Sequence, residues 1–286
     1  MAARRRTRAL RFDLKKSGFY AVFIRETGTL VATPVLKKSI RSEVSPEEWA
    51  LRIDLAALYR LVALYGWDDM ILTHISLRLP GPQNHFLLNP FGVLFDEMTA
   101  SSLVKVGPEG NAVDPGTTDI NYPGFILHGA LHLAREDARC VLHLHTPDGV
   151  AVAAQEHGLL PITQHAMMQY RDIGYHDYEG VVVEMDERER LVRDLGDKHC
   201  MILRNHGTLT VGRNCAEAFL RMYFLERACT MQVRAMAGGA KINKAADEAV
   251  AKTFGRAHQQ LDGNFPAKAW PGLLRKLDRI DPSYRN

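Results

Sequence analysis

Three histidines have the spacing needed to bind one divalent metal ion. His143 and His145 flank a single leucine in the apolar run 140–145, and His206 follows the apolar run 201–203. Side chains alternate along a strand, so His143 and His145 should point to the same side of a sheet. Three neutral imidazoles at strand ends suit an ion with an open coordination position, as in catalytic zinc sites. We therefore predict a metal site, with Zn²⁺ as the first choice and Mn²⁺ or Fe²⁺ as alternatives. The other interpretation is three ordinary histidines with satisfied hydrogen bonds.

Neighbouring elements would hold these histidines in place. A predicted helix over 125–134 precedes the strand of His143, and a charged amphipathic helix over 186–195 precedes a second strand over 201–204. A hairpin partner over 208–212 follows His206. The histidines are therefore expected at the ends of neighbouring strands.

Two strong helix starts frame this region. Ser45 and Pro46, followed by Glu48, form the pattern of a capping box. Asn214 precedes a long apolar stripe that runs to about Met236. A small apolar helix and several short strands are predicted between these points. They are the helix 149–155 and the strands 75–79, 85–89, 103–106 and 179–183. This mixture predicts an α/β fold.

The composition favours a folded protein with a sizeable core. Of 286 residues, 46% are hydrophobic. No apolar run reaches the length of a membrane span, and no signal peptide follows the arginine-rich start, which predicts a soluble cytoplasmic protein. The four cysteines lie far apart, mostly in apolar segments, which indicates buried thiols and no disulfide framework.

Charge and pattern divide the chain into three parts. The N-terminal arm is strongly basic, whereas the rest is mildly acidic. A solvated, partly disordered arm is a simpler interpretation than a nucleic-acid or membrane contact, so neither partner is predicted. The arm contains a possible strand pair over 19–24 and 29–33, and the C-terminal tail is expected to be irregular, with one helix near 245–254. The predicted parts are the arm 1–44, one α/β domain 45–240 and the tail 241–286.

Several motifs of the central domain resemble the class II aldolase/adducin family. Their order and spacing are specific, and the likeness is greatest to the adducin-head branch and its bacterial relatives. The resemblance implies an α/β/α sandwich around a mainly antiparallel sheet, and a homo-oligomer, often a tetramer, with the metal site near a subunit boundary. The motifs are Gly66-Trp67-Asp68-Asp69, Thr73-His74-Ile75-Ser76, Asn89-Pro90-Phe91-Gly92, Thr99-Ala100-Ser101-Ser102-Leu103-Val104-Lys105, His143-Leu144-His145-Thr146-Pro147, Tyr175-His176-Asp177-Tyr178 and Arg204-Asn205-His206-Gly207.

The resemblance also implies a chemistry. The three histidines that hold Zn²⁺ or a similar ion in the family's enzymes match His143, His145 and His206. The ion polarises the hydroxy-carbonyl group of a sugar-like substrate and stabilises an enediolate. A small-molecule substrate of carbohydrate metabolism and carbon–carbon lyase chemistry are therefore expected.

Two departures from the family's aldolases concern the catalytic acid/base and the phosphate site. The catalytic glutamate of those enzymes matches Gly124, and Asp119 is the nearby carboxylate that could replace it. At the phosphate-binding turns this chain has Ile71, His74 and Asn121. A sugar phosphate is therefore disfavoured, whereas His74 and Asn121 are candidates for binding a substrate carboxylate.

A third departure concerns proton transfer. The aromatic acid that the aldolases supply across a subunit interface matches His165, and a histidine can also donate a proton near neutral pH. Tyr175 is a further catalytic candidate, although the motif 175–178 could equally be a structural turn. His128 and His132 have helical spacing, and we expect one to pack near the site and the other to be exposed.

Three functions remain open at this point. The leading hypothesis is a metal-dependent aldolase-like lyase acting on a small hydroxy-carbonyl or sugar-derived substrate. The alternative is a non-catalytic, adducin-head-like assembly module, which the absent glutamate and the altered turns favour. A third hypothesis is a three-histidine Fe²⁺ site that activates O₂, because a fold does not fix a chemistry.

Overall fold

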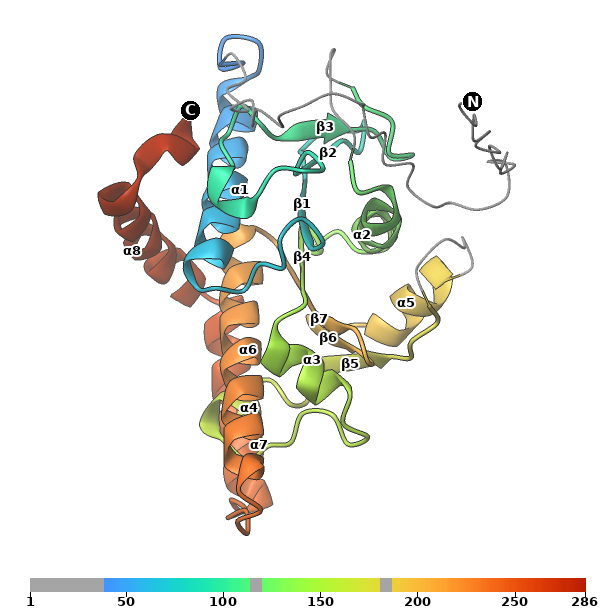
Figure 1. Ribbon diagram of the computed structural model, residues 1–286, viewed down its shortest axis with the longest axis vertical. Helices are drawn as coiled ribbons and strands as arrows, with labels where there is room; N and C mark the ends of the chain where they lie inside the picture. Colours follow the sequence, from blue (N-terminus) through green and yellow to red (C-terminus); the bar gives the residue numbers. More distant parts are fainter. Residues whose placement is uncertain (1–38, 114–119, 181–186) are drawn as a thin grey trace, which may run out of the picture. The chain divides into compact units, whose positions relative to one another are not determined.

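The sheet that carries the histidines is enclosed by helices on both faces (Figure 1). The structure is a computed structural model that describes residues 39–113, 120–180 and 187–286. Within these residues the sheet has seven strands in the order β3-β2-β1-β4-β7-β6-β5. All neighbouring pairs are antiparallel except the parallel pair β5–β6. The predicted α/β/α sandwich is confirmed. The strands are β1 (His74–Arg78), β2 (Phe86–Leu88), β3 (Val104–Val106), β4 (Cys140–Leu144), β5 (Ile173–His176), β6 (Cys200–Leu203) and β7 (Gly207–Gly212).

The helices divide between the two faces of the sheet. α2 (Tyr122–Ala134) and α5 (Glu187–Leu195) cover one face, and α1 (Pro46–Leu64), α3 (Pro147–Ala153) and α6 (Cys215–Ala237) cover the other. Each face has its own buried apolar cluster, which supplies the main driving force for folding. The remaining helices are η1 (Phe95–Glu97), α4 (Gln164–Met167), α7 (Asp247–Asp262), α8 (Phe265–Ile280) and η2 (Pro282–Arg285).

The predicted helix starts are confirmed by their caps. The Ser45 hydroxyl accepts a hydrogen bond from the backbone N–H of Glu48 at 3.1 Å. The Asn214 side chain accepts one from the N–H of Glu217 at 3.0 Å. Each cap satisfies a backbone donor that has no partner within the helix.

Alternation along β4 decides which face the first histidine occupies. Leu142 and Leu144 pack into the cluster under α1 and α6, whereas Val141 packs into the cluster under α2 and α5. His143 shares the parity of Val141 and therefore emerges on the α2/α5 face. β4 lies centrally, between β1 and β7, so this histidine is buried by neighbours on both sides.

Most of the predicted strand over 179–183 lies outside the described residues, and its first two residues are not part of a strand. The strand of this region is β5 at Ile173–His176, which pairs in parallel with β6. Glu179 and Gly180 lie outside any strand, and residues 181–186 are outside the described residues. Gly180 has a φ of 105°, a conformation that interrupts an extended run.

The C-terminal tail is not irregular as expected, although the one helix predicted near 245–254 corresponds to α7. Residues after 246 form α7, α8 and η2, which pack against the domain. Trp270 is buried and donates a hydrogen bond to Asp54 at 3.0 Å, and Tyr284 is fully buried. The apolar residues of these helices form only a narrow stripe with helical period among many charged residues, so the stripe is easy to overlook in the sequence.

Three further predictions concern the cysteines, membrane-spanning helices and the basic arm. All four cysteines are buried and free, as expected. None of the described helices combines the length and apolar character needed to cross a bilayer. Most of the basic arm, including its possible strand pair, lies outside the described residues.

Candidate metal centre

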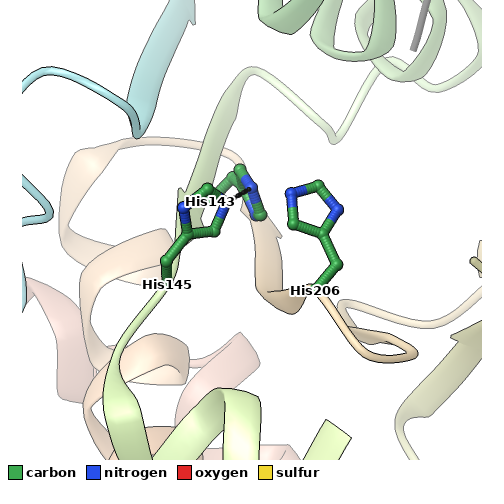
Figure 2. A group of neighbouring side chains, drawn as sticks. All are labelled: His143, His145 and His206. Carbon is green, nitrogen blue, oxygen red and sulfur yellow. Dashed lines mark hydrogen bonds between the residues drawn. The ribbon is translucent and has the colours of Figure 1, made fainter. Parts of the chain in front are cut away.

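The three predicted histidines converge at one end of the central strands (Figure 2). His143 lies on β4, His145 just beyond the end of β4, and His206 in the turn that joins β6 to β7. One ring nitrogen from each lies within 4.8 Å of the others. The centroids of the three rings are 4.6 to 4.8 Å apart. This arrangement can hold a single metal ion.

The turn that carries His206 depends on its two neighbours. Asn205 has a φ of 59°, in the left-handed region that asparagine tolerates better than most residues. Gly207 begins β7 directly against the end of β4. A Cβ at Gly207 would lie only 2.3 Å from the carbonyl oxygen of Leu144. The absence of a side chain at this position therefore lets His206 approach the other two histidines.

Hydrogen bonds on the far side of two rings fix which nitrogens can bind an ion. His143 Nδ1 donates to the carbonyl oxygen of Thr208 at 2.9 Å. His145 Nδ1 lies 3.2 Å from the carboxylate of Asp69 and donates to it. The two Nε2 atoms face each other at 2.8 Å and need a cation between them, either a proton or a metal ion. Ligating histidines are typically held by a carbonyl or carboxylate in this way, so the donor set fits a metal.

Burial favours the neutral, metal-binding form of the imidazoles. It lowers the pKa of His143 well below its ordinary value. The nearby rings of His145 and His206 lower the pKa of His143 further. The pKa of His206 falls to about 4, chiefly through burial and then through His145 and His176. His143 and His206 are therefore neutral at pH 7, which suits a divalent cation.

A buried carboxyl group beneath the triad was missed in the sequence analysis. Glu226 of α6 is 2% exposed and accepts hydrogen bonds from the hydroxyls of Thr146 and Thr208. Thr146 follows His145 in sequence, and Thr208 binds His143 through its carbonyl oxygen. Glu226 thus links the two segments that carry the histidines. The available signal was a single glutamate within the apolar stripe of this helix.

We expect Glu226→Gln to change how the stability of the fold depends on pH. Burial raises the pKa of Glu226 from 4.5 to about 7. A carboxyl whose pKa is higher in the folded chain stabilises fully below pH 4.5, and this contribution is lost as the pH rises through about 7. The loss amounts to about 3 kcal/mol. Urea unfolding at about pH 5 and about pH 8 should show this loss in the wild type but not in the glutamine variant. An equal loss in both proteins would contradict the assignment, and the exposed Glu156→Gln is the control.

His74 lies beside the triad, as its predicted role in the site requires. It pairs in register with His143 across β1 and β4, and the two ring centroids are 5.2 Å apart. Burial lowers its pKa to about 3, with further contributions from His145 and His206. Its ring occupies the space next to Gly124, where a Cβ would lie 2.2 Å from Nε2. The absence of a side chain at Gly124 therefore leaves room for this imidazole.

Asn121 caps the helix that begins next to the site. Its side-chain oxygen accepts a hydrogen bond from the backbone N–H of Gly124 at 3.2 Å. That contact commits the oxygen, while the carboxamide N–H₂ group keeps its capacity to donate. Asp119, the other carboxylate considered for proton transfer, lies outside the described residues.

The two predicted proton-transfer residues are not brought to the triad by any contact among the described residues. Tyr175 packs into the cluster on the α1/α6 face, and its hydroxyl accepts a hydrogen bond from Leu159 N–H at 3.1 Å. His143 emerges on the opposite face. His165 lies on α4, with its ring 5.7 Å from that of Phe224. Burial, followed by the charge of Arg227, lowers the pKa of His165.

One of the paired helical histidines packs beside His74 as expected, but the expectation that the other is exposed is wrong. His128 and His132 are 1% and 0% exposed, so neither faces solvent. Both rings bind the hydroxyl of Ser76 on β1, each at 2.7 Å. Their shared helical face points inward onto the sheet, because β1 lies beneath α2.

A small pocket adjoins the triad on the side of His206. Its walls include His176, Tyr178 and Arg204. The Tyr178 ring lies 6.3 Å from that of His206, and the pKa of neighbouring Glu187 is raised, chiefly by burial. The pocket places polar and aromatic groups next to a candidate metal ligand.

Comparison with known proteins agrees with this geometry. Residues 53–233 match the family model described as the class II aldolase and adducin N-terminal domain. The chain belongs to this family. The matched segment contains the whole histidine triad and most of the domain predicted over 45–240.

Relatives within the family include both aldolase-type proteins and adducins. A Caulobacter vibrioides protein named "Putative aldolase class 2 protein" is 54% identical, over 86% of this chain and 96% of its own length. Mouse alpha-adducin is 46% identical, over 72% of this chain and 29% of its own length. The solved L-fuculose 1-phosphate aldolase of Glaciozyma antarctica is 27% identical with a TM-score of 0.73, over 89% of this chain and 97% of its own. The resemblance to adducins and bacterial class II aldolases is confirmed.

Proposed function

We propose that this chain is a divalent-metal-dependent carbon–carbon lyase of the aldolase type. The observation that carries the proposal is the second set of contacts around the triad. Thr208 and Asp69 hold the Nδ1 protons of His143 and His145, so that the Nε2 atoms are presented to one point. Zn²⁺ is the first choice, because three imidazoles leave it one open position, and Mn²⁺ or Fe²⁺ are alternatives.

The site suits a small substrate with adjacent hydroxyl and carbonyl groups. A bound divalent ion would act as a Lewis acid that polarises the carbonyl and stabilises an enediolate. The protein would orient the substrate through two residues. They are His74, which pairs with His143 across β1 and β4, and Asn121, which caps the start of α2. The altered turns disfavour a phosphorylated sugar, so we propose an unphosphorylated, sugar-derived molecule.

Proton transfer in this proposal uses a group from another subunit. Among the described residues of one chain, the carboxylate hydrogen-bonded to the triad is Asp69, which already orients His145. His165 matches the position that other aldolases use across an interface, and its half-buried, neutral ring can accept or donate a proton. Tyr175 fits this role less well, because its hydroxyl points into the opposite face. The proposal therefore includes a homotetramer with His165 contributed by a partner copy.

Elemental analysis of the purified protein tests the metal centre directly. We expect about one equivalent of Zn, Mn or Fe per chain in the wild type, and a loss of more than about tenfold in His143→Ala/His145→Ala. The exposed His157→Ala serves as the matched control and should keep its metal. A wild-type protein that purifies without metal, and does not take it up on addition, would contradict the proposal.

A second candidate function is a non-catalytic assembly module like an adducin head. The observation that favours it is Gly124, since a glycine at the position of the catalytic glutamate cannot move a proton. In that case the metal ligands would matter little for biological activity. A His143→Ala chain that folds and complements a deletion of its own gene would support this candidate over the lyase.

A further inference from the structure

A chain of buried hydrogen bonds runs from the triad into the layer between β1 and α2. His74 Nδ1 lies 2.9 Å from His128 Nε2, and His128 Nδ1 lies 2.7 Å from Ser76 Oγ. Ser76 Oγ lies 2.7 Å from His132 Nε2, and His132 Nδ1 lies 2.6 Å from the carbonyl oxygen of Ala138. The four side chains are at most 7% exposed. The chain therefore ends at a backbone atom that can only accept.

The carbonyl group of Ala138 sets the direction of every bond in the chain. His132 must carry its proton on Nδ1 to donate to that carbonyl, so its Nε2 accepts from the Ser76 hydroxyl. Ser76 has only one proton and therefore accepts from His128 Nδ1–H. The Nε2 of His128 is then bare and accepts from His74 Nδ1–H. A neutral His74 is consequently left with a lone pair on Nε2.

The surroundings of the chain keep its rings neutral. Burial lowers the pKa of His132 to about 3, and the positive charge of Arg78 opposes its protonation further. Burial lowers the pKa of His128 well below its ordinary value, and its neighbours His74 and His132 add to this. An extra proton would also turn one of the accepting nitrogens into a second donor, which would break a bond in the chain.

The free nitrogen of His74 belongs to a ring that lies beside the triad. Nε2 has no hydrogen-bond partner among the described residues, and the side chain is 7% exposed. It faces Gly124 in the first turn of α2, and the ring is next to that of His143. Any side chain at position 124 would fill the space that this imidazole occupies.

We propose that His74 Nε2 is a fixed hydrogen-bond acceptor that recognises a hydroxyl group of the substrate and disfavours a carboxylate or phosphate at that position. The inference rests on the proposed function for the location of the substrate, and it narrows the substrate class to a neutral hydroxy-carbonyl compound. It differs from the expectation that His74 binds a substrate carboxylate, because a lone pair repels an anionic oxygen. His128, Ser76 and His132 act as positioning residues, since they fix the proton on His74 without touching the ligand.

The proton positions can be measured on the full chain without a substrate. Nitrogen NMR of protein labelled with ¹⁵N-histidine distinguishes a protonated ring nitrogen from a bare one. We expect a proton on Nδ1 and none on Nε2 for His74, His128 and His132, and a mixed pattern at His74 in Ser76→Ala. A proton on His74 Nε2 in the wild type would overturn the inference. A wild type that binds no metal would instead contradict the proposed function.

Binding of two probes to the metal-loaded protein tests recognition itself. Dihydroxyacetone presents hydroxyl groups, whereas acetate presents a carboxylate and no hydroxyl. We expect His74→Phe to weaken dihydroxyacetone by about 3- to 10-fold, the range for one hydrogen bond, and not to weaken acetate.

Ser76 supplies a test that does not alter any group proposed to touch the ligand. Ser76→Ala should reduce the preference for dihydroxyacetone in the same direction as His74→Phe, while Ser76→Thr, which keeps the hydroxyl, should retain it. Equal changes for both probes, or none, would overturn the inference. If His74→Phe fails to fold, the Ser76 pair carries the test, because it removes or restores a single hydroxyl.

Discussion

Gly207→Ala is expected to lower the free energy of unfolding by about 3 kcal/mol and to abolish metal binding. The added Cβ would lie 2.3 Å from the carbonyl oxygen of Leu144. That oxygen belongs to the backbone at the end of β4, so it cannot move away as a flexible side chain would. Relief requires β4 and β7 to separate at the ends that adjoin His145 and His206. One methyl group thus affects both the fold and the site.

Chemical denaturation and elemental analysis of the same preparation would check this result. Gly255→Ala is the matched control, because a Cβ at Gly255 meets nothing within 4 Å and the residue is exposed within α7. That substitution should stabilise the chain by about 0.5 to 1 kcal/mol, since alanine favours a helix over glycine. A Gly207→Ala protein with wild-type stability and metal content would show that β4 and β7 need not approach so closely.

The protein without metal is expected to lose stability steeply as the pH falls below about 6.5. The pKa of His132 is lowered from 6.5 to about 3 by burial, and that of His128 is lowered well below 6.5. A group whose pKa is depressed in the folded chain contributes stability above its unfolded pKa and loses it as the pH falls towards the folded value. The rings stay neutral in the fold but bind protons once the chain unfolds, so acid favours unfolding.

His132→Asn isolates one part of this acid sensitivity. An asparagine can still donate and accept hydrogen bonds, but it does not titrate. Between about pH 7 and pH 5, the wild type should lose about 2 kcal/mol more than the variant, as measured by urea unfolding with excess chelator. The exposed His157→Asn should behave like the wild type. Parallel curves for the wild type and His132→Asn would mean that His132 is not neutral in the fold.

The sequence predicted the local features of the fold well, because short-range chemistry determines them. The caps at Ser45 and Asn214 depend on residues within a few positions of one another. The apolar runs around His143 and before His206 identified β4 and β6. One C-terminal helix was predicted and corresponds to α7, whereas α8 was not predicted, because its apolar stripe is narrow and gains its stability by packing against α1 and α6.

For the candidate site, the residue types and spacing of the triad were sufficient to predict three converging histidines, since a His-x-His strand leaves little choice of direction. Its supporting groups depend on contacts between residues far apart in the sequence. The pairing of Asp69 with His145, and of Glu226 with Thr146, joins segments about eighty residues apart. From the sequence alone we expected His74 to bind a substrate carboxylate, whereas the hydrogen bond at its Nδ1 leads us to propose a substrate hydroxyl.

The sequence by itself determined the family and the strand that presents two of the candidate ligands. Only the tertiary structure decided which nitrogen of each histidine is free. A proton on an imidazole is placed by whatever accepts it, and for His132 that acceptor is the carbonyl of Ala138, a backbone atom on which the side-chain types carry no information. Through Ser76 and His128, this contact determines what His74 offers to a ligand.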